Sequence, residues 1–144
     1  MTRLAHIYAK LPHAGSMRLL EQVAAWDDQS IRCVTHSHRS PDNPLRDIGG
    51  LAAAHAIEYA AQAAAVHGIL CGKLDGGPEL LLAAARDLIL HRRRLDDLPD
   101  ELRVDARLQV RVGAGARYGF LLTSGESHCV SGIISMMPHA GAWP

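Results

Sequence analysis

The chain is 144 residues long, about the size of one domain, and long enough to bury one hydrophobic core. Its formal net charge is zero with histidine neutral, only 4% of its residues are aromatic, and no long block of like charge occurs, so neither nucleic acid nor a membrane surface is indicated as a partner. We therefore expect a single domain over residues 1–144 that acts on a small or protein-borne substrate.

The N-terminus and the cysteines are typical of a soluble, cytoplasmic protein. Residues 1–13 lack the long apolar core of a signal peptide, and no uninterrupted apolar run approaches the roughly 20 residues of a membrane span. The three cysteines, Cys33, Cys71 and Cys129, are widely spaced and include no C-x-x-C pair, which argues against a disulfide framework and against a structural zinc site. We expect reduced cysteines, no bound metal and no cofactor.

Two strands are predicted near the start of the domain. Residues 17–26 and 30–38 flank an acidic turn, and in the second of these stretches Ile31 and Cys33 alternate with polar neighbours. The following stretch, RSPDNPLRDIGG at 39–50, carries two prolines and two glycines and is predicted to be a loop.

An alanine-rich helix is predicted after this loop, from about Leu51 to Cys71. The helix is apolar on nearly all sides, so most of its circumference must be buried. Alanine keeps helix propensity high and lets neighbouring strands approach the helix axis closely. The polar residues His55, Glu58 and Gln62 are spaced at i, i+3 and i+7 and therefore share one stripe of the helix.

Four further strands are predicted after the glycine-rich stretch 72–78, which ends the helix. The clearest is 102–113, where an apolar residue occupies every second position from Leu102 to Val112. The others are 79–92, 116–124 and 129–137. We expect the four to pair in succession as an antiparallel sheet with short turns at GAGA and SGES, and this sheet to curve around the helix.

Two motifs occur in this order of elements: LPHAGSMRLLEQV at 11–23 and AIEYAAQAAA at 56–65. Together with the layout, they resemble the hotdog-fold 3-hydroxyacyl-(acyl carrier protein) dehydratases, and especially the divergent dehydratase-like branch of aryl polyene biosynthesis. The resemblance covers nearly the whole chain. It implies an α+β hotdog fold, in which a curved antiparallel sheet wraps one long central helix. It also implies elimination of water from a 3-hydroxyacyl thioester to give a trans-2-enoyl thioester.

The same resemblance implies the partners. The acyl group would arrive as a thioester of acyl carrier protein or of coenzyme A. Enzymes of this kind are dimers with substrate tunnels at the subunit interface, so a homodimer is expected here. A higher oligomer, or a heterodimer with another dehydratase, is the alternative.

The resemblance assigns the chemistry to a helix carboxylate and a histidine. Glu58 matches the carboxylate, in an apolar site expected to raise its pKa so that it carries a proton at neutral pH. One group removes the C2 proton and the other protonates the departing hydroxyl, which is typically worth about 10²–10⁴-fold in rate. Gln62 can orient Glu58 from one turn away. Backbone N–H groups near Ala52, Ala53 and Ala54, at the helix N-terminus, are expected to polarise the thioester carbonyl.

The sequence departs from the family pattern at the histidine. Fatty-acid dehydratases carry it in a G-H-F-P-G-x-P motif in the loop before the helix, and this chain has Pro44 at that position. We expect His13 of the LPH motif to take the role, with His55 on the helix stripe as the alternative. Behind them come His36 and His38, which are predicted to alternate onto one face at the end of the second strand.

Other functions stay open at this point. Glu58 could be a structural acid paired with an arginine such as Arg86, because an unpaired buried carboxylate is costly. The same fold could hydrolyse a thioester with the helix carboxylate and a water. The chain could also be a non-catalytic partner subunit, which the missing loop histidine supports. The basic run 92–94 is either a solvated strand end or an attractive patch for an acidic carrier protein.

Overall fold

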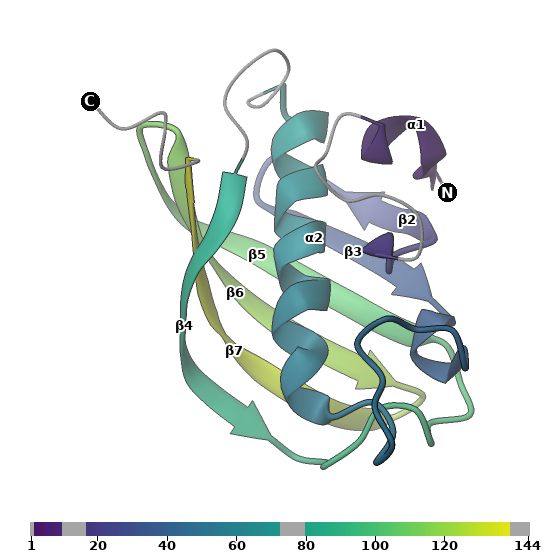
Figure 1. Ribbon diagram of the computed structural model, residues 1–144. Helices are drawn as coiled ribbons and strands as arrows, with labels where there is room; N and C mark the ends of the chain where they lie inside the picture. The colour runs from purple at the N-terminus through teal and green to yellow at the C-terminus, as the bar shows by residue number, and fades with distance from the viewer. Residues whose placement is uncertain (1, 10–16, 73–79, 139–144) are drawn as a thin grey trace.

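The computed structural model describes residues 2–9, 17–72 and 80–138. Over these ranges the chain forms a curved antiparallel sheet with the long helix α2 (Ala56–Leu70) lying across it (Figure 1). The short helix α1 (Ala5–Tyr8) lies beside α2. Two 3-10 turns, η2 (Ser37–Arg39) and η3 (Ala53–His55), precede α2 in the chain. The strands are β1 (Thr2–Arg3), β2 (Gln22–Trp26), β3 (Ser30–Thr35), β4 (Leu80–Leu90), β5 (Leu102–Val112), β6 (Gly115–Ser124) and β7 (Ser127–Pro138).

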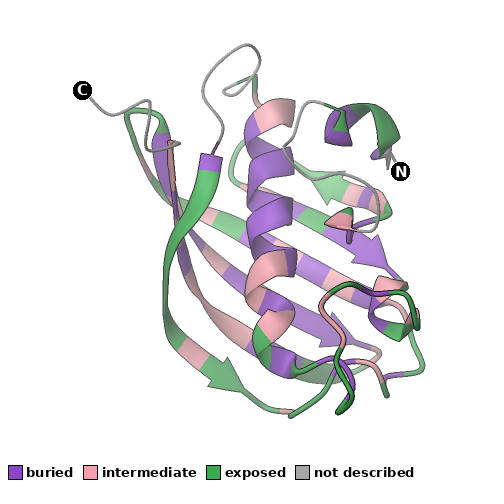
Figure 2. Ribbon diagram, in the orientation of Figure 1, coloured by how far each residue is buried: buried purple, intermediate pink, exposed green. Residues whose placement is uncertain are grey.

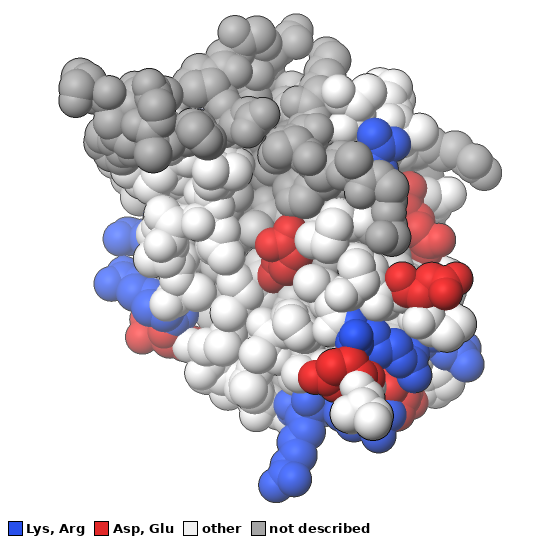
Figure 3. All heavy atoms as spheres, viewed as in Figure 1, with Lys and Arg blue, Asp and Glu red and all other residues white. Residues whose placement is uncertain are grey.

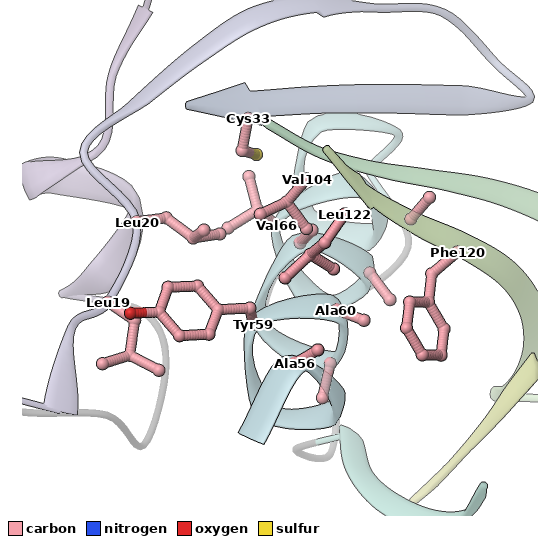
Figure 4. Packing of buried hydrophobic residues seen from close by; sticks show 14 of the residues in the cluster. Leu19, Leu20, Cys33, Ala56, Tyr59, Ala60, Val66, Val104, Phe120 and Leu122 are labelled. Atoms are coloured by element: carbon pink, nitrogen blue, oxygen red, sulfur yellow. The ribbon is translucent and has the colours of Figure 1, made fainter. Parts of the chain in front are cut away.

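The alanines of α2 allow it to lie close against the sheet. From Tyr59 to Gly68 every residue of the helix is buried, as Figure 2 shows by colour. The packing in Figure 4 brings Ala60 and Val66 of α2 against Val104 of β5 and Leu122 of β6. Small side chains at the contact bring the helix axis close to the strands, so the core is filled mainly by the larger residues of the sheet. The predicted hotdog architecture is confirmed.

The strand order is β1-β2-β3-β5-β6-β7-β4, with every neighbouring pair antiparallel. The predicted hairpins β2–β3, β5–β6 and β6–β7 are present. The expectation that 79–92 pairs with 102–113 is wrong, because β4 pairs with β7 at one edge of the sheet and β5 pairs with β3 in its middle. The segment between β4 and β5 runs beside the backbone that leads into α2, where the amide of Leu95 donates to the carbonyl of Leu51.

The predicted strands of the opening hairpin are longer than the observed ones. The first begins only at Gln22, because the amides of Leu19 and Leu20 are bonded to side chains of α2 and α1 instead of to a neighbouring strand. The second ends at Thr35, where the chain turns into η2. His36 and His38 therefore do not alternate along a strand, contrary to the sequence-based expectation.

Candidate functional site

Glu58 lies in the first turn of α2, in a helix whose other polar groups are largely buried. Its side chain is half-buried, and the helix N-terminus favours a negative charge at this position. The Gln62 side-chain amide donates from Nε2 to Glu58 Oε1 at 3.2 Å. His55, also half-buried, is the N-cap residue of α2, three positions before Glu58. The predicted contact between Gln62 and Glu58 is therefore present, whereas the catalytic roles of these residues stay predictions.

Gln62 is completely buried and uses both ends of its amide. Its Oε1 accepts hydrogen bonds from the Tyr8 hydroxyl at 2.6 Å and from the backbone N–H of Leu19 at 3.0 Å. Its Nε2 donates to the Met17 carbonyl at 2.7 Å as well as to Glu58. Exchanging the oxygen and nitrogen would set donor against donor and acceptor against acceptor, so these partners fix the orientation of the amide.

The loop before α2, where the family pattern places its histidine, is fastened to the helix by a buried polar network. The Asn43 side-chain amide donates to the carbonyl of Ser37 at 2.9 Å and to the Tyr59 hydroxyl at 3.1 Å. Ser37 Oγ donates to the Leu19 carbonyl at 2.6 Å, so the Tyr59 hydroxyl donates to Ser37 Oγ over the 2.8 Å between them. In Figure 4 the Tyr59 ring extends from α2 toward Leu19. The loop thus has a defined structural attachment at this position.

The backbone that leads into α2 is held by the segment after β4. The amide of Ala53 donates to the carbonyl of Arg93 at 2.8 Å, so it is already used within the chain. Three amides were predicted to polarise a thioester carbonyl, and the prediction stands for those of Ala52 and Ala54. These two residues are exposed, Ala52 as the N-cap of η3 and Ala54 within it.

A nearly buried carboxylate supports the same backbone. The side chain of Asp96 is only 2% exposed. It accepts hydrogen bonds from the Leu51 amide at 2.9 Å and from Arg94 at 2.6 Å, and Arg46 lies 3.4 Å away. The hydrogen bond from Arg94 holds the pKa of this carboxyl well below its usual range. Gly50 has a φ of +99° and would place a Cβ 2.6 Å from Asp96 Oδ1, so only glycine fits there.

The other predicted histidines that the structure describes, His36 and His38, have partners away from α2. His13 lies outside the described residues. His36 is exposed, with Nδ1 3.4 Å from Glu21 Oε1. His38 is buried, with Nε2 3.2 Å from the Leu98 carbonyl, and burial lowers its pKa. Within the described ranges no group of three or more potential metal ligands occurs.

Sequence reasoning missed one buried histidine, His67. Its Nε2 lies 2.8 Å from the carbonyl of Asp27, and its Nδ1 lies 2.7 Å from the Tyr118 hydroxyl. A carbonyl requires a donor, so Nε2 carries the proton and Nδ1 accepts one from Tyr118. Burial lowers the pKa of His67. A histidine in an alanine-rich run gives no periodic signal, so only the partners identify this one as a link from α2 to β6 and to the β2–β3 turn.

The edge strand β4 presents an apolar surface. Leu81, Leu82, Ile89 and Leu90 are all more than a third exposed, and Asp87 adopts a positive φ of 53° where the pairing with β7 is interrupted. The face that spans α2 and β4 carries mostly uncharged atoms in Figure 3.

The basic run after β4 is largely paired within its own segment. Arg92 donates to Asp97 at 3.0 Å, and Arg94 to Asp96. The run therefore forms local ion pairs near a strand end, which argues against its being an attractive patch for an acidic carrier protein.

Comparison with known proteins gives a consistent picture. A family model described as ApeP dehydratase matches residues 5–141. The dehydratase heterocomplex ApeI:P from Xenorhabdus doucetiae is similar in structure, with a TM-score of 0.78, 22% identity, and coverage of 90% of this chain and 88% of that one. A search of curated proteins found no match.

Two more distant structures share the fold. A hypothetical thioesterase with coenzyme A from Streptococcus pneumoniae has a TM-score of 0.59 at 12% identity, covering 82% of this chain and 84% of that one. The protein smu.793 from Streptococcus mutans, bound to acetyl CoA, has a TM-score of 0.61 at 13% identity, covering 88% of this chain and 96% of that one.

The described part of this chain contains no helix long and apolar enough to cross a membrane.

Proposed function

The chain belongs to the ApeP-like dehydratase family, and from this premise we propose that it eliminates water from a 3-hydroxyacyl thioester to give a trans-2-enoyl thioester. The observation that carries the proposal is Glu58, a half-buried carboxylate on the alanine-rich central helix, bonded to the amide of Gln62. The substrate class proposed is an acyl group on acyl carrier protein or coenzyme A, within aryl polyene biosynthesis.

The reaction needs a base for the C2 proton and an acid for the leaving hydroxyl. A thioester α-proton is weakly acidic and hydroxide is a poor leaving group, so each transfer benefits from a positioned side chain. Glu58 supplies one of the two groups. The amides of Ala52 and Ala54, two exposed residues at the positive end of the helix dipole, would stabilise the negative charge that develops on the thioester oxygen.

The second group is a histidine, and two residues of this chain are candidates. His55 lies near Glu58 at the start of α2, and His13 belongs to the motif shared with the family. The loop 39–50 contains no histidine, and Asn43 and Ser37 fasten it to Tyr59 instead. This departure favours two alternatives that retain the fold: thioester hydrolysis by Glu58 with a water, and a partner role beside another dehydratase subunit.

Assembly into a dimer is part of the proposal. The related structure from Xenorhabdus doucetiae is a dehydratase heterocomplex. In this chain the edge strand β4 exposes apolar side chains, and such a strand pairs readily with a strand of another subunit. A homodimer through β4 is the arrangement that we propose, with a heterodimer of the same geometry as the alternative.

The test is intact mass spectrometry of 3-hydroxyacyl-carrier protein and 3-hydroxyacyl-coenzyme A after incubation with purified protein or its Glu58→Gln variant. Glutamine keeps the size of the side chain and removes its proton chemistry. We expect wild type to remove one water from the substrate and the variant to lose at least about a hundredfold in rate, the scale of general acid–base catalysis.

The products separate the alternatives. Release of the free hydroxy acid supports a thioesterase. A non-catalytic partner is supported by two results together. Wild type alone leaves the substrate unchanged, and after a second dehydratase subunit is added, turnover is the same with wild type and with Glu58→Gln. His13→Ala and His55→Ala, assayed in the same way, distinguish the two histidines.

A further inference from the structure

We propose that Tyr8 is a positioning residue for Glu58, acting through Gln62 from the N-terminal helix α1. The inference rests on the proposed function and adds to it a connection between two distant parts of the chain. Tyr8 is buried, and its hydroxyl donates to Gln62 Oε1 at 2.6 Å while accepting the Leu20 amide at 2.8 Å. The chain of donors therefore runs from Leu20 through Tyr8 and Gln62 to Glu58.

The direction of this chain is set by its first members. The Leu20 amide can only donate, so the Tyr8 oxygen accepts that hydrogen bond and the Tyr8 hydroxyl donates its own hydrogen to Gln62. Burial raises the pKa of Tyr8, and the charge of Glu58 raises it further, so the phenol stays a donor over the working range of pH. The Arg18 guanidinium lies 5.7 Å from the centre of the Tyr8 ring, within the range of a cation–π contact.

The consequence appears at Glu58. A hydrogen bond that Gln62 Oε1 accepts polarises the amide and strengthens the donation of its Nε2 to Glu58 Oε1. A protonated oxygen is a poor acceptor, so the bond favours an unprotonated Oε1 and places the proton of the Glu58 carboxylic acid on Oε2. Tyr8 thus helps to select the oxygen that exchanges protons with the substrate, and it stabilises the charged form of the carboxyl.

The groups that surround this chain come from several elements. Tyr8 lies on α1 and Arg18 on the segment before β2. His55 ends η3 as the N-cap of α2, and Tyr59 lies on α2 with Glu58. On β3, the Cys33 thiol is buried, and burial raises its pKa to about 12, so it is neutral beside the network. Glu58 is bonded to the nitrogen of the Gln62 amide, and Tyr8 is the titratable group bonded to its oxygen.

The experiment compares Tyr8→Phe with Tyr118→Phe. Both variants delete one buried phenol hydroxyl that donates to a side chain of α2, but Tyr118 is bonded to His67 and not to Gln62. For Tyr8→Phe we expect kcat to fall about tenfold with KM changed less than about twofold, as for the loss of one hydrogen bond to a functional group. The pH profile limb that belongs to Glu58 should move to higher pH, whereas Tyr118→Phe should keep the wild-type profile.

A second readout does not depend on turnover. The titration of Glu58, followed by NMR of its side-chain carboxyl carbon, should shift upward by about half a unit in Tyr8→Phe and stay in place in Tyr118→Phe. An unchanged titration and pH profile in Tyr8→Phe would overturn the inference, as would equal shifts in the two variants. Wild type that leaves its substrate intact while the NMR shift is present would contradict the proposed function and leave the hydrogen-bond chain established.

Discussion

At the scale of single residues, the most consequential side chain outside the proposed catalytic group is Asp96. It holds the Leu51 amide and two guanidinium groups beside the backbone that enters α2. We expect Asp96→Ala to lower the free energy of unfolding by about 2 kcal/mol, because hydrogen bonds to a charged group are lost and the Leu51 amide is left without its acceptor. Asp96→Asn should cost less, since its amide oxygen can still accept from Leu51. Urea denaturation measures both.

The neighbouring aspartate provides a matched control. Asp97 pairs with Arg92 in an ion pair whose side chains are 46% and 35% exposed, and exposed pairs contribute little. Asp97→Ala should therefore change the unfolding free energy by less than about 0.5 kcal/mol. Equal losses in the two alanine variants would show that burial does not distinguish these carboxylates.

At the scale of elements, the C-terminal half of α2 depends on an uncharged histidine. His67 joins the helix to Tyr118 on β6 and to the turn after β2. Its lowered pKa means that the unfolded chain binds a proton more readily than the folded chain. The contribution to stability is therefore complete above the ordinary histidine pKa of about 6.5 and is lost as the pH falls below it. His38, also buried, acts in the same direction.

The urea midpoint should accordingly be lower at about pH 5 than at about pH 7.5. His67→Gln should reduce stability at the higher pH and weaken the dependence on pH, since glutamine can donate to Asp27 but does not titrate. A wild-type midpoint that is equal at both values of pH would contradict a neutral buried His67. So would a His67→Gln variant whose midpoint depends on pH as strongly as that of wild type.

The elements themselves were more predictable than their neighbours in the sheet. Alternation along 102–113 and the acidic and glycine turns are local signals, and they placed β5, β6, β7 and the first hairpin. Strand order is not local: β4 reads as a strand, but nothing in its residues indicates that it pairs with β7 and leaves the position beside β5 to β3. The expected pairing of 79–92 with 102–113 was wrong for this reason, because the partner of an edge strand depends on contacts between residues far apart in the sequence.

The candidate site was predictable to the extent that it lies on one helix. Glu58 and Gln62 are four residues apart, so their contact follows from helix geometry. Tyr8 and Leu19 reach Gln62 from 54 and 43 residues away, and no sequence spacing encodes such contacts. The end of β3 was misplaced for a related reason, because the bonds that divert the chain at Ser37 come from Asn43 and Tyr59.

At the scale of the whole molecule, the sheet is protected unequally at its two edges. The β1 edge is short, with two residues, whereas β4 has eleven residues and carries exposed leucines and isoleucine. Long apolar edge strands pair readily with other chains, and proteins usually shorten, charge or cover them. The bulge at Asp87 interrupts the pairing of β4 with β7 but leaves the stretch from Leu80 to Arg86 regular apart from one shift. A partner strand along this first half of β4 is the expected cover.

This cover predicts the effect of a charge on β4. Leu82 is 38% exposed in the isolated chain, and in a two-fold assembly an arginine there would appear twice in one apolar interface. We expect wild type to sediment as a dimer at micromolar concentration and Leu82→Arg to weaken its Kd by about a hundredfold, which is about 1.4 kcal/mol for each copy. Trp26→Arg, an exposed aromatic on β2 far from β4 in the strand order, should leave the dimer intact. A wild-type monomer at the same concentrations would contradict the proposed dimer. Dissociation by Trp26→Arg but not by Leu82→Arg would place the dimer interface away from β4.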